Sequence, residues 1–145
     1  MSLCAKHVYR PDMAEFQVVV GDPDTGKSYQ FTVEGKDANQ FIGKEIGDEI
    51  EGRLVGLDGY TLLLTGGSDI IGRQLSKNIK GTAPQKILIT DQSGQKTGLR
   101  SGERKRITVR GREISDQTSQ INTVVSTKGK ISIEATLNPT EELEE

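Results

Sequence analysis

Apolar and polar residues alternate with a period of two along several short stretches of the chain. The clearest examples are Phe16 to Val20 and Ser28 to Val33, which are rich in Val, Phe and Tyr. Because successive side chains of a strand point to opposite faces, this alternation predicts strands with one buried face. The residues between them, 21–26, are turn formers, so the two strands are predicted to form a hairpin.

Further stretches of the same kind follow. Residues 49–57 and 60–65 are separated by an Asp-Gly dipeptide, which is typical of tight hairpins and predicts a second one. Asp37 is predicted to cap a short helix that ends near Gly43, since Asp accepts from free N–H groups and Gly ends helices. Later strands are predicted at Lys86–Thr90, Arg106–Val109, Ile121–Ser126 and around Ile131–Glu134.

These elements predict a mainly β fold, a small barrel-like domain of six or seven short strands with one short helix. We expect the domain to cover residues 14–127. Residues 1–13 are predicted to be a disordered N-terminal extension, so that Met13 competes with Met1 as the start. Residues 128–145 are predicted to be a C-terminal tail that ends in a disordered acidic run.

The amino-acid composition indicates what the core is made of and argues against disulfides, metal sites and membrane spans. Aromatic residues make up 4% of the chain and Trp is absent, so the core is predicted to be small and built from Val, Ile and Leu. The single Cys, Cys4, excludes an intramolecular disulfide and any multi-Cys metal site. No apolar run reaches the roughly 18 residues that a membrane span requires. We therefore expect a cytoplasmic protein without a metal or cofactor.

The net charge of −2 conceals a strong separation of charge along the chain. Residues 73–112 contain eleven basic and two acidic residues, whereas the rest of the chain contains eight basic and nineteen acidic residues. A basic segment beside an acidic body is typical of a nucleic-acid face backed by a solvated surface. A mixed, purely solvating surface would also produce such a pattern.

One short motif points to a different function. Residues 21–28, GDPDTGKS, match the phosphate-loop pattern, in which backbone N–H groups and a helix N-terminus bind phosphate. Here the residues after Lys27 alternate like a strand, Pro23 removes an N–H donor, and two carboxylates would face the phosphates. We therefore interpret the motif as a hairpin turn with Lys27 in solvent. The only His, His7, lies in the predicted extension, so no catalytic constellation supports an enzyme.

Two other segments carry the functional interpretation. In residues 64–72 the paired glycines Gly66 and Gly67 follow a strand and permit close backbone approach, while Asp69 is predicted to bond back to local N–H groups. Residues 100–112 hold six basic residues and no aromatic. If Arg104 to Arg110 form a strand, the arginines share one face and Ile107 and Val109 enter the core from the other. Arginine suits phosphate because its planar group binds two oxygens at once.

Both segments resemble signatures of the archaeal and eukaryotic small-subunit ribosomal protein six family. The first signature begins with an aliphatic residue, continues with Ser or Thr, and ends with Gly-Gly-x-Asp-x-x-Gly. Leu64 to Gly72 match it. Beyond the match, Gln74 and Leu75 stand where the family has Pro and Met. The second is Gly-Glu-Arg, two basic residues, two variable ones and Val-Arg-Gly, which Gly102 to Gly111 match. The resemblance covers residues 13–127 and is that of a short, archaeal-type member.

The resemblance implies a β-barrel core, ribosomal RNA of the small subunit as ligand, neighbouring ribosomal proteins as partners and no catalysis. We predict that the protein neutralises phosphates of folded RNA rather than reading bases, since aromatic stacking surfaces are missing from the basic segment. An adaptor that binds an acidic protein is the alternative, besides a nucleotide-binding protein. The predicted RNA contacts are Arg100, Arg104, Lys105, Arg106, Arg110 and Arg112, with Arg73 and Lys77 as helpers; Gly66, Gly67, Asp69 and Gly72 are predicted to build a structural loop.

Overall fold

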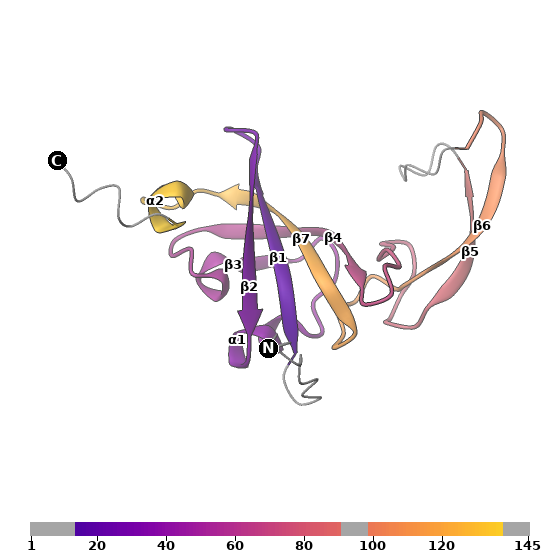
Figure 1. Cartoon of the computed structure of the whole chain (residues 1–145), viewed down its shortest axis with the longest axis horizontal. Helices are drawn as coiled ribbons and strands as arrows, with labels where there is room; N and C mark the ends of the chain where they lie inside the picture. Colours follow the sequence, from indigo (N-terminus) through magenta and orange to yellow (C-terminus); the bar gives the residue numbers. More distant parts are fainter. Residues whose placement is uncertain (1–13, 91–98, 138–145) are drawn as a thin grey trace, which may run out of the picture.

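The strands of the chain form two separate sheets in the computed structural model, which describes residues 14–90 and 99–137 (Figure 1). The larger sheet has the strand order β2-β1-β7-β4-β3. Its members are β1 (Glu15–Asp22), β2 (Lys27–Glu34), β3 (Glu49–Glu51), β4 (Thr61–Asp69) and β7 (Thr118–Thr127). The smaller sheet pairs β5 (Gln85–Thr90) with β6 (Arg104–Val109) and is called the ribbon below. The mainly β fold predicted from the sequence is confirmed.

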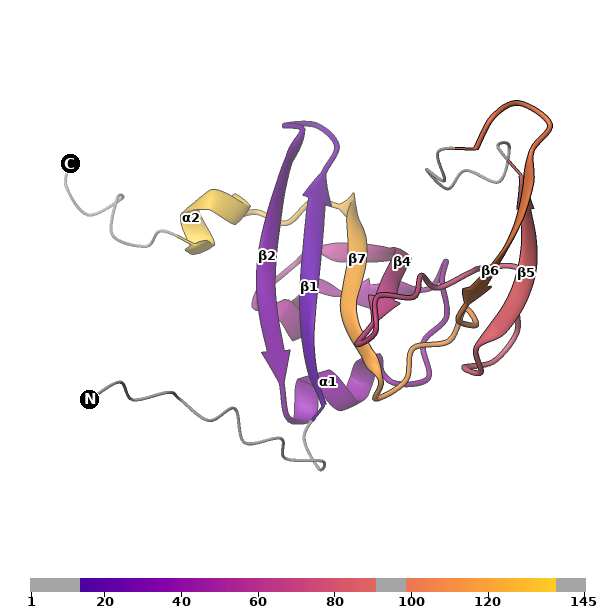
Figure 2. The same cartoon turned by 45° about the vertical axis from the view of Figure 1, so that its right-hand side comes forward.

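The larger sheet curls around a hydrophobic cluster, and together with the helices it forms what we call the barrel (Figure 2). β1 runs parallel to β7, and the other neighbouring strands are antiparallel. The pairing of β4 with β7 shifts register at three places, and such bulges bend and twist a sheet. Phe16, Val18 and Val20 alternate inward from β1 and meet Leu62 and Leu64 of β4 in the cluster.

Three short helical turns close the barrel. α1 (Lys36–Phe41) buries Ala38 and Phe41, and the Phe41 ring meets Phe16 edge to face at 6.3 Å between centroids. The 3₁₀ helix η1 (Gly52–Val55) follows β3 directly. α2 (Ile133–Leu137) buries Ile133 in the same cluster as the strands. Ile131–Glu134 was predicted as a late strand, which is wrong, because the helix begins at Ile133.

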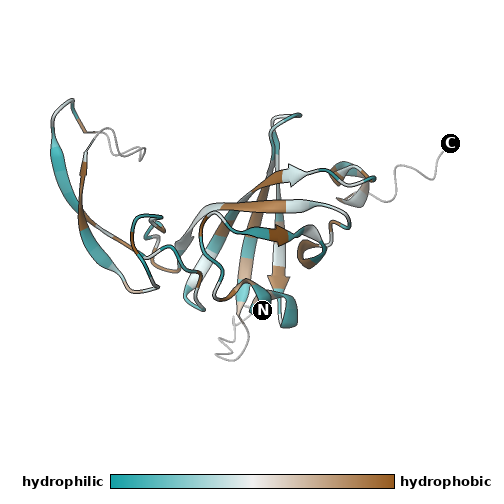
Figure 3. Ribbon diagram, turned by 180° about the vertical axis from the view of Figure 1, so that it is seen from behind, coloured by the Kyte–Doolittle hydropathy of each residue, from teal (hydrophilic) through white to brown (hydrophobic). Residues whose placement is uncertain are grey.

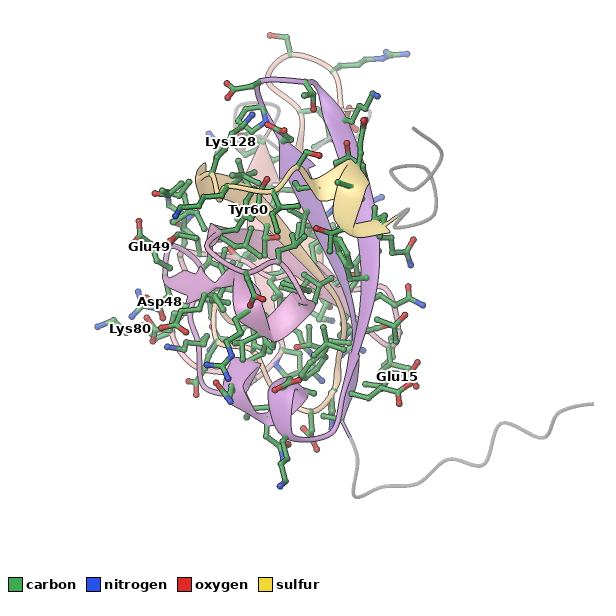
Figure 4. All side chains as sticks on the ribbon, turned by 90° about the vertical axis from the view of Figure 1, so that its left-hand side faces the viewer. Glu15, Asp48, Glu49, Tyr60, Lys80 and Lys128 are labelled. Atoms are coloured by element: carbon green, nitrogen blue, oxygen red, sulfur yellow. The ribbon has the colours of Figure 1, made fainter. Side chains whose placement is uncertain are left out.

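The residues after β7 pack against the barrel rather than leaving it. The Tyr60 hydroxyl donates to the carbonyl oxygen of Ile131 at 2.7 Å, and Figure 4 shows Tyr60 beside this segment. Lys128 bridges Asp22 and Asp24 at 3.3 and 2.9 Å. The part of the predicted tail up to residue 137 therefore belongs with the barrel. The predicted extension, residues 1–13, and the acidic run, 141–145, lie outside the described residues.

The first predicted hairpin is confirmed, and the second is only partly right. β1 and β2 pair from Glu15 with Glu34 to Asp22 with Lys27, so the phosphate-loop motif forms a hairpin turn followed by a strand. β3 ends at Glu51 instead of continuing to residue 57, because the chain turns into η1 before the Asp-Gly turn. Asp37 makes no capping bond and lies within the first turn of α1, where Gly35 is the N-cap residue.

The later strands were predicted correctly as β5, β6 and β7, but β5 and β6 do not join the barrel sheet. Ile89 and Val109 are buried, yet neither belongs to the cluster that fills the barrel. The expectation that Ile107 and Val109 enter the main core is therefore wrong. None of the helices formed by the described residues is both long and apolar enough to cross a membrane.

Candidate nucleic-acid interface

The ribbon projects from the barrel (Figure 1), and its strand β6 holds three of the predicted contacts, Arg104, Lys105 and Arg106. β5 and β6 are antiparallel, with Leu88 opposite Arg106, Thr90 opposite Arg104 and Lys86 opposite Thr108. Side chains directly opposite each other lie on the same face of a two-stranded sheet. Arg104, Arg106 and Lys86 therefore share one face, which we call the cationic face.

The opposite face of the ribbon is apolar except at its two ends, where Gln85 and Lys105 lie. Ile87 lies opposite Ile107, and Ile89 lies opposite Lys105. Ile89 and Val109 are buried, whereas Lys105 is exposed near the end of this face. This division explains the alternation of side chains along β6, because one row of side chains packs against the protein and the other row reaches solvent. Figure 3 shows that the ribbon is hydrophilic over much of its length, in contrast to the barrel strands.

The cationic face is available for a ligand. Arg104, Arg106 and Lys86 are exposed, and no ion pair joins them to another described residue. Leu88 lies among them with 53% of its surface exposed. Arg100 is exposed in the turn before β6, where its N–H donates to the Glu103 carboxylate at 3.0 Å. A row of exposed cations of this kind is suited to neutralising the phosphates of a nucleic-acid backbone.

Arg110 lies at the end of β6 but does not belong to the cationic face. Its side chain is 10% exposed and donates to the Asp69 carboxylate at 2.8 Å, to the Thr82 carbonyl at 3.3 Å and to the Gln117 side chain. Three of the five N–H groups of this guanidinium are bonded inside the protein, and its low exposure leaves little of it within reach of a phosphate. We therefore revise the prediction for Arg110, whose geometry fits a structural role.

The remaining predicted contacts are spread over the segments that join the ribbon to the barrel. Arg112 lies 3.0 Å from the Glu45 carboxylate, so its charge is partly neutralised within the barrel. Arg73 is half-buried and Lys77 is exposed on the connection from β4 to β5. None of these three cations lies in β5 or β6, so none belongs to the cationic face.

The predicted loop at 66–72 is partly a strand. Gly66 and Gly67 lie within β4, and the turn comes after Asp69, where Gly72 has a φ of 95°. The Asp69 carboxylate accepts from the N–H groups of Ile71 at 2.9 Å and Arg73 at 2.8 Å, as the sequence predicted. This turn presents Ile70 and Ile71 to solvent and leaves Asp69 itself buried.

Lys86 and Leu88 lie on the cationic face but were not among the residues predicted from the sequence. Both lie in a stretch predicted to be a strand, but their side of that strand depends on its register with β6. The alternation of Ile87 and Ile89 was the available signal, because it assigns the residues between them to the opposite, exposed face.

The fold and this ribbon define a mainly β protein with a projecting basic arm. The model of the family described as ribosomal protein S6e matches residues 16–138. The chain therefore belongs to the ribosomal protein S6e family.

Relatives named small ribosomal subunit protein eS6 are similar over most of their length. The protein from Haloarcula marismortui is 52% identical over 117 residues, covering 81% of this chain and 90% of the relative. The protein from Methanococcoides burtonii is 46% identical, covering 79% and 83%. The protein from Archaeoglobus fulgidus is 45% identical over 129 residues, covering 88% and 99%. The predicted archaeal type of the chain is confirmed.

Proposed function

We propose that this protein is a structural constituent of the small ribosomal subunit in the cytoplasm and that its ribbon binds ribosomal RNA. Family membership supports the subunit role, and the cationic face supports the RNA contact. Among the described cations, those of this face are exposed side by side without a carboxylate partner. The protein would act by binding and not by catalysing a reaction, with other ribosomal proteins as its neighbours.

The chemistry of the face favours the backbone of folded RNA over single strands. No aromatic residue occurs anywhere in the chain after Tyr60, so the ribbon has no ring on which an unpaired base can stack. Arginine forks suit phosphate oxygens, and an A-form helix exposes phosphates and 2′-hydroxyls along a shallow groove. We propose Arg100, Arg104, Arg106 and Lys86 as the main contacts, with Lys105, Arg73 and Lys77 at the margins.

The distribution of acidic residues supports this orientation. Carboxylates such as Asp48 and Glu49 point outward from the barrel on the side shown in Figure 4, and Glu15 and Glu34 are exposed on β1 and β2. A polyanion is repelled by such a surface and attracted by the ribbon. The barrel would therefore face solvent or protein while the ribbon enters the RNA.

The test is the salt dependence of RNA binding by single variants. Arg104→Ala and Arg106→Ala should each weaken binding to small-subunit RNA and reduce the slope of log affinity against log salt by about 0.7–0.9, one released counterion. Arg53→Ala removes the same charge from an exposed site on the barrel and should change neither quantity. Equal effects of all three variants would show that the ribbon is not the contact.

An adaptor for an acidic protein is the competing function, and sedimentation separates the two. A ribosomal constituent should travel with small subunits in a cell extract and remain with them after a high-salt wash, because many contacts hold it. An adaptor should leave the subunits in that wash and appear in lighter fractions with its protein partner.

A further inference from the structure

The two segments that carry the family signatures, residues 64–72 and 102–111, meet where the ribbon joins the barrel. Arg110 lies next to the end of the second segment, and Asp69 lies near the end of the first, 41 residues earlier. Their side chains form an ion pair with 2.8 Å between Nε and Oδ2, and they are 10% and 1% exposed. Of the ion pairs between described residues, this is the most deeply buried.

Each partner is also bound to the chain around it. Asp69 accepts from two backbone N–H groups of the turn that follows β4. These bonds and the Arg110 guanidinium outweigh the effect of burial, which by itself raises the pKa of Asp69, so that this pKa lies below its ordinary value. Arg110 reaches Thr82 on the segment leading into β5 and Gln117 on the segment leading into β7. One guanidinium therefore ties together three segments that enter and leave the ribbon.

Two glycines beside this ion pair are packed so closely against other backbone segments that no side chain fits in their place. A Cβ atom at Gly67 would lie 2.4 Å from the carbonyl oxygen of Gln120, and one at Gly111 would lie 1.8 Å from the carbonyl oxygen of Gly81. The N–H of Ser76 donates to the Arg110 carbonyl, and the N–H of Arg110 donates to the Gln74 carbonyl. We call this region, centred on Asp69, Arg110, Gly67 and Gly111, the junction.

The ribbon depends on the junction for its direction. Its strands pair with each other and with no strand of the barrel. An isolated two-stranded sheet is only marginally stable in water, so the contacts at its connections must help to hold it. The buried pair and the close glycine contacts replace the missing strand pairing as the structure that aims the ribbon.

We infer that Asp69 and Arg110 are positioning residues for RNA binding: they touch no RNA themselves but hold the cationic face in the direction in which it binds. This inference rests on the proposed function of the ribbon. It also gives one physical reason for the two signatures, because Gly-Gly-x-Asp and Val-Arg-Gly supply the two halves of one junction. If the ion pair is lost, we expect the ribbon to lie in the binding direction in a smaller fraction of the molecules.

Two measurements test this inference: the direction of the ribbon in the absence of RNA, and the affinity of the protein for RNA. In a chain with Cys4→Ser, spin labels at Glu51→Cys on the barrel and Ser101→Cys in the turn that enters β6 report the distance between the barrel and the ribbon. The parent chain should give one narrow distance distribution. Asp69→Asn should broaden it, because the amide cannot hold the guanidinium as firmly. Arg110→Lys keeps a cation beside Asp69 but loses the forked contacts, and it should give an intermediate width.

RNA binding is then measured with unlabelled chains carrying the same two substitutions. If the binding direction is populated a tenth of the time, affinity should fall on the order of tenfold. The salt slope should stay unchanged, because all phosphate contacts still form in the complex. Glu134→Gln, which removes an exposed ion pair far from the ribbon, is the matched control and should change neither the distance nor the affinity.

The outcomes separate this inference from the proposed function. A distribution as narrow in Asp69→Asn as in the parent, or a broadened one with parental affinity, overturns the positioning role. A reduced salt slope in either junction variant overturns it as well, since that would make the residue a contact. Should Asp69→Asn fail to fold, Arg110→Lys decides by the same criteria. The proposed function fails separately, if Arg104→Ala and Arg106→Ala bind RNA like the parent chain.

Discussion

The barrel and the ribbon are both built from strands in which apolar and polar side chains alternate, yet they are stabilised in different ways. The barrel buries one face of five strands around Phe16, Leu62 and Ile121, and its exposed surface is rich in carboxylates. The ribbon has two strands, few buried side chains and a row of unpaired cations. The part of the molecule that is suited to binding therefore contributes little to stability and depends on the junction for its geometry.

The largest difference between the two regions is expected for the loss of an apolar side chain. Phe16→Ala removes a fully buried ring that meets Phe41 edge to face, and it should lower the free energy of unfolding by about 3–5 kcal/mol. Leu88→Ala on the ribbon removes a side chain that is 53% exposed and should cost less than about 0.5 kcal/mol. Urea unfolding followed by circular dichroism measures both. Similar losses would contradict the division between a stabilising barrel and a binding ribbon.

Loss of the Asp69 charge should be nearly as costly, and its cost should depend on pH. Asp69→Asn leaves the buried Arg110 without its counter-charge and should lower the free energy of unfolding near neutral pH by about 3 kcal/mol. The pKa of Asp69 is lowered in the folded chain. A carboxyl of this kind stabilises the fold above its unfolded-state pKa of about 3.9, and the contribution is lost as the pH falls through the folded value.

The difference between the parent chain and Asp69→Asn should therefore be constant above about pH 5 and shrink below about pH 4. Urea unfolding at a series of pH values measures it. A difference that persists unchanged to pH 3 would mean that Asp69 acts through packing rather than through its charge.

A smaller effect is expected for an added methyl group at the junction. Gly111→Ala would place a Cβ 1.8 Å from the Gly81 carbonyl oxygen, so the two backbones must separate, at a cost of about 1–3 kcal/mol. Gly66→Ala is the matched control in β4, because a Cβ there has no heavy atom within 4 Å and the φ of Gly66 is not positive. Thermal unfolding of both variants tests whether tightness is confined to the junction; equal shifts would show that it is not.

The sequence predicted those features that depend on neighbouring residues. The alternation from Phe16 to Val33 predicted the first hairpin, and the Asp69 carboxylate was predicted to bond to local N–H groups, as it does. Charge counting also located the basic segment. These features are encoded within a few residues of one another, which is why a pattern along the chain reveals them.

Features that depend on distant segments were not predictable in the same way. Arg110 looks like its neighbours Arg104 and Arg106 in the sequence, and only the approach of Asp69 turns it inward. Likewise, Ile107 and Val109 alternate like residues of the main core, but β6 pairs with β5 alone. The prediction of a late strand at Ile131–Glu134 was wrong because the Tyr60 hydroxyl and the barrel cluster hold that segment in a turn that leads into a helix.

The smallest effect is expected for the exposed ion pair between Lys27 and Glu134, which provides the counterpart to the buried pair at the junction. Lys27 Nζ lies 2.6 Å from Glu134, yet the two side chains are 62% and 55% exposed. Water and salt screen such a pair, and ordering two long side chains offsets what attraction remains. Glu134→Gln, which can still accept from Tyr29, should leave the thermal unfolding midpoint unchanged at low and high salt. A clear loss at low salt that disappears at high salt would show instead that this pair fastens the C-terminal segment to the β1–β2 hairpin.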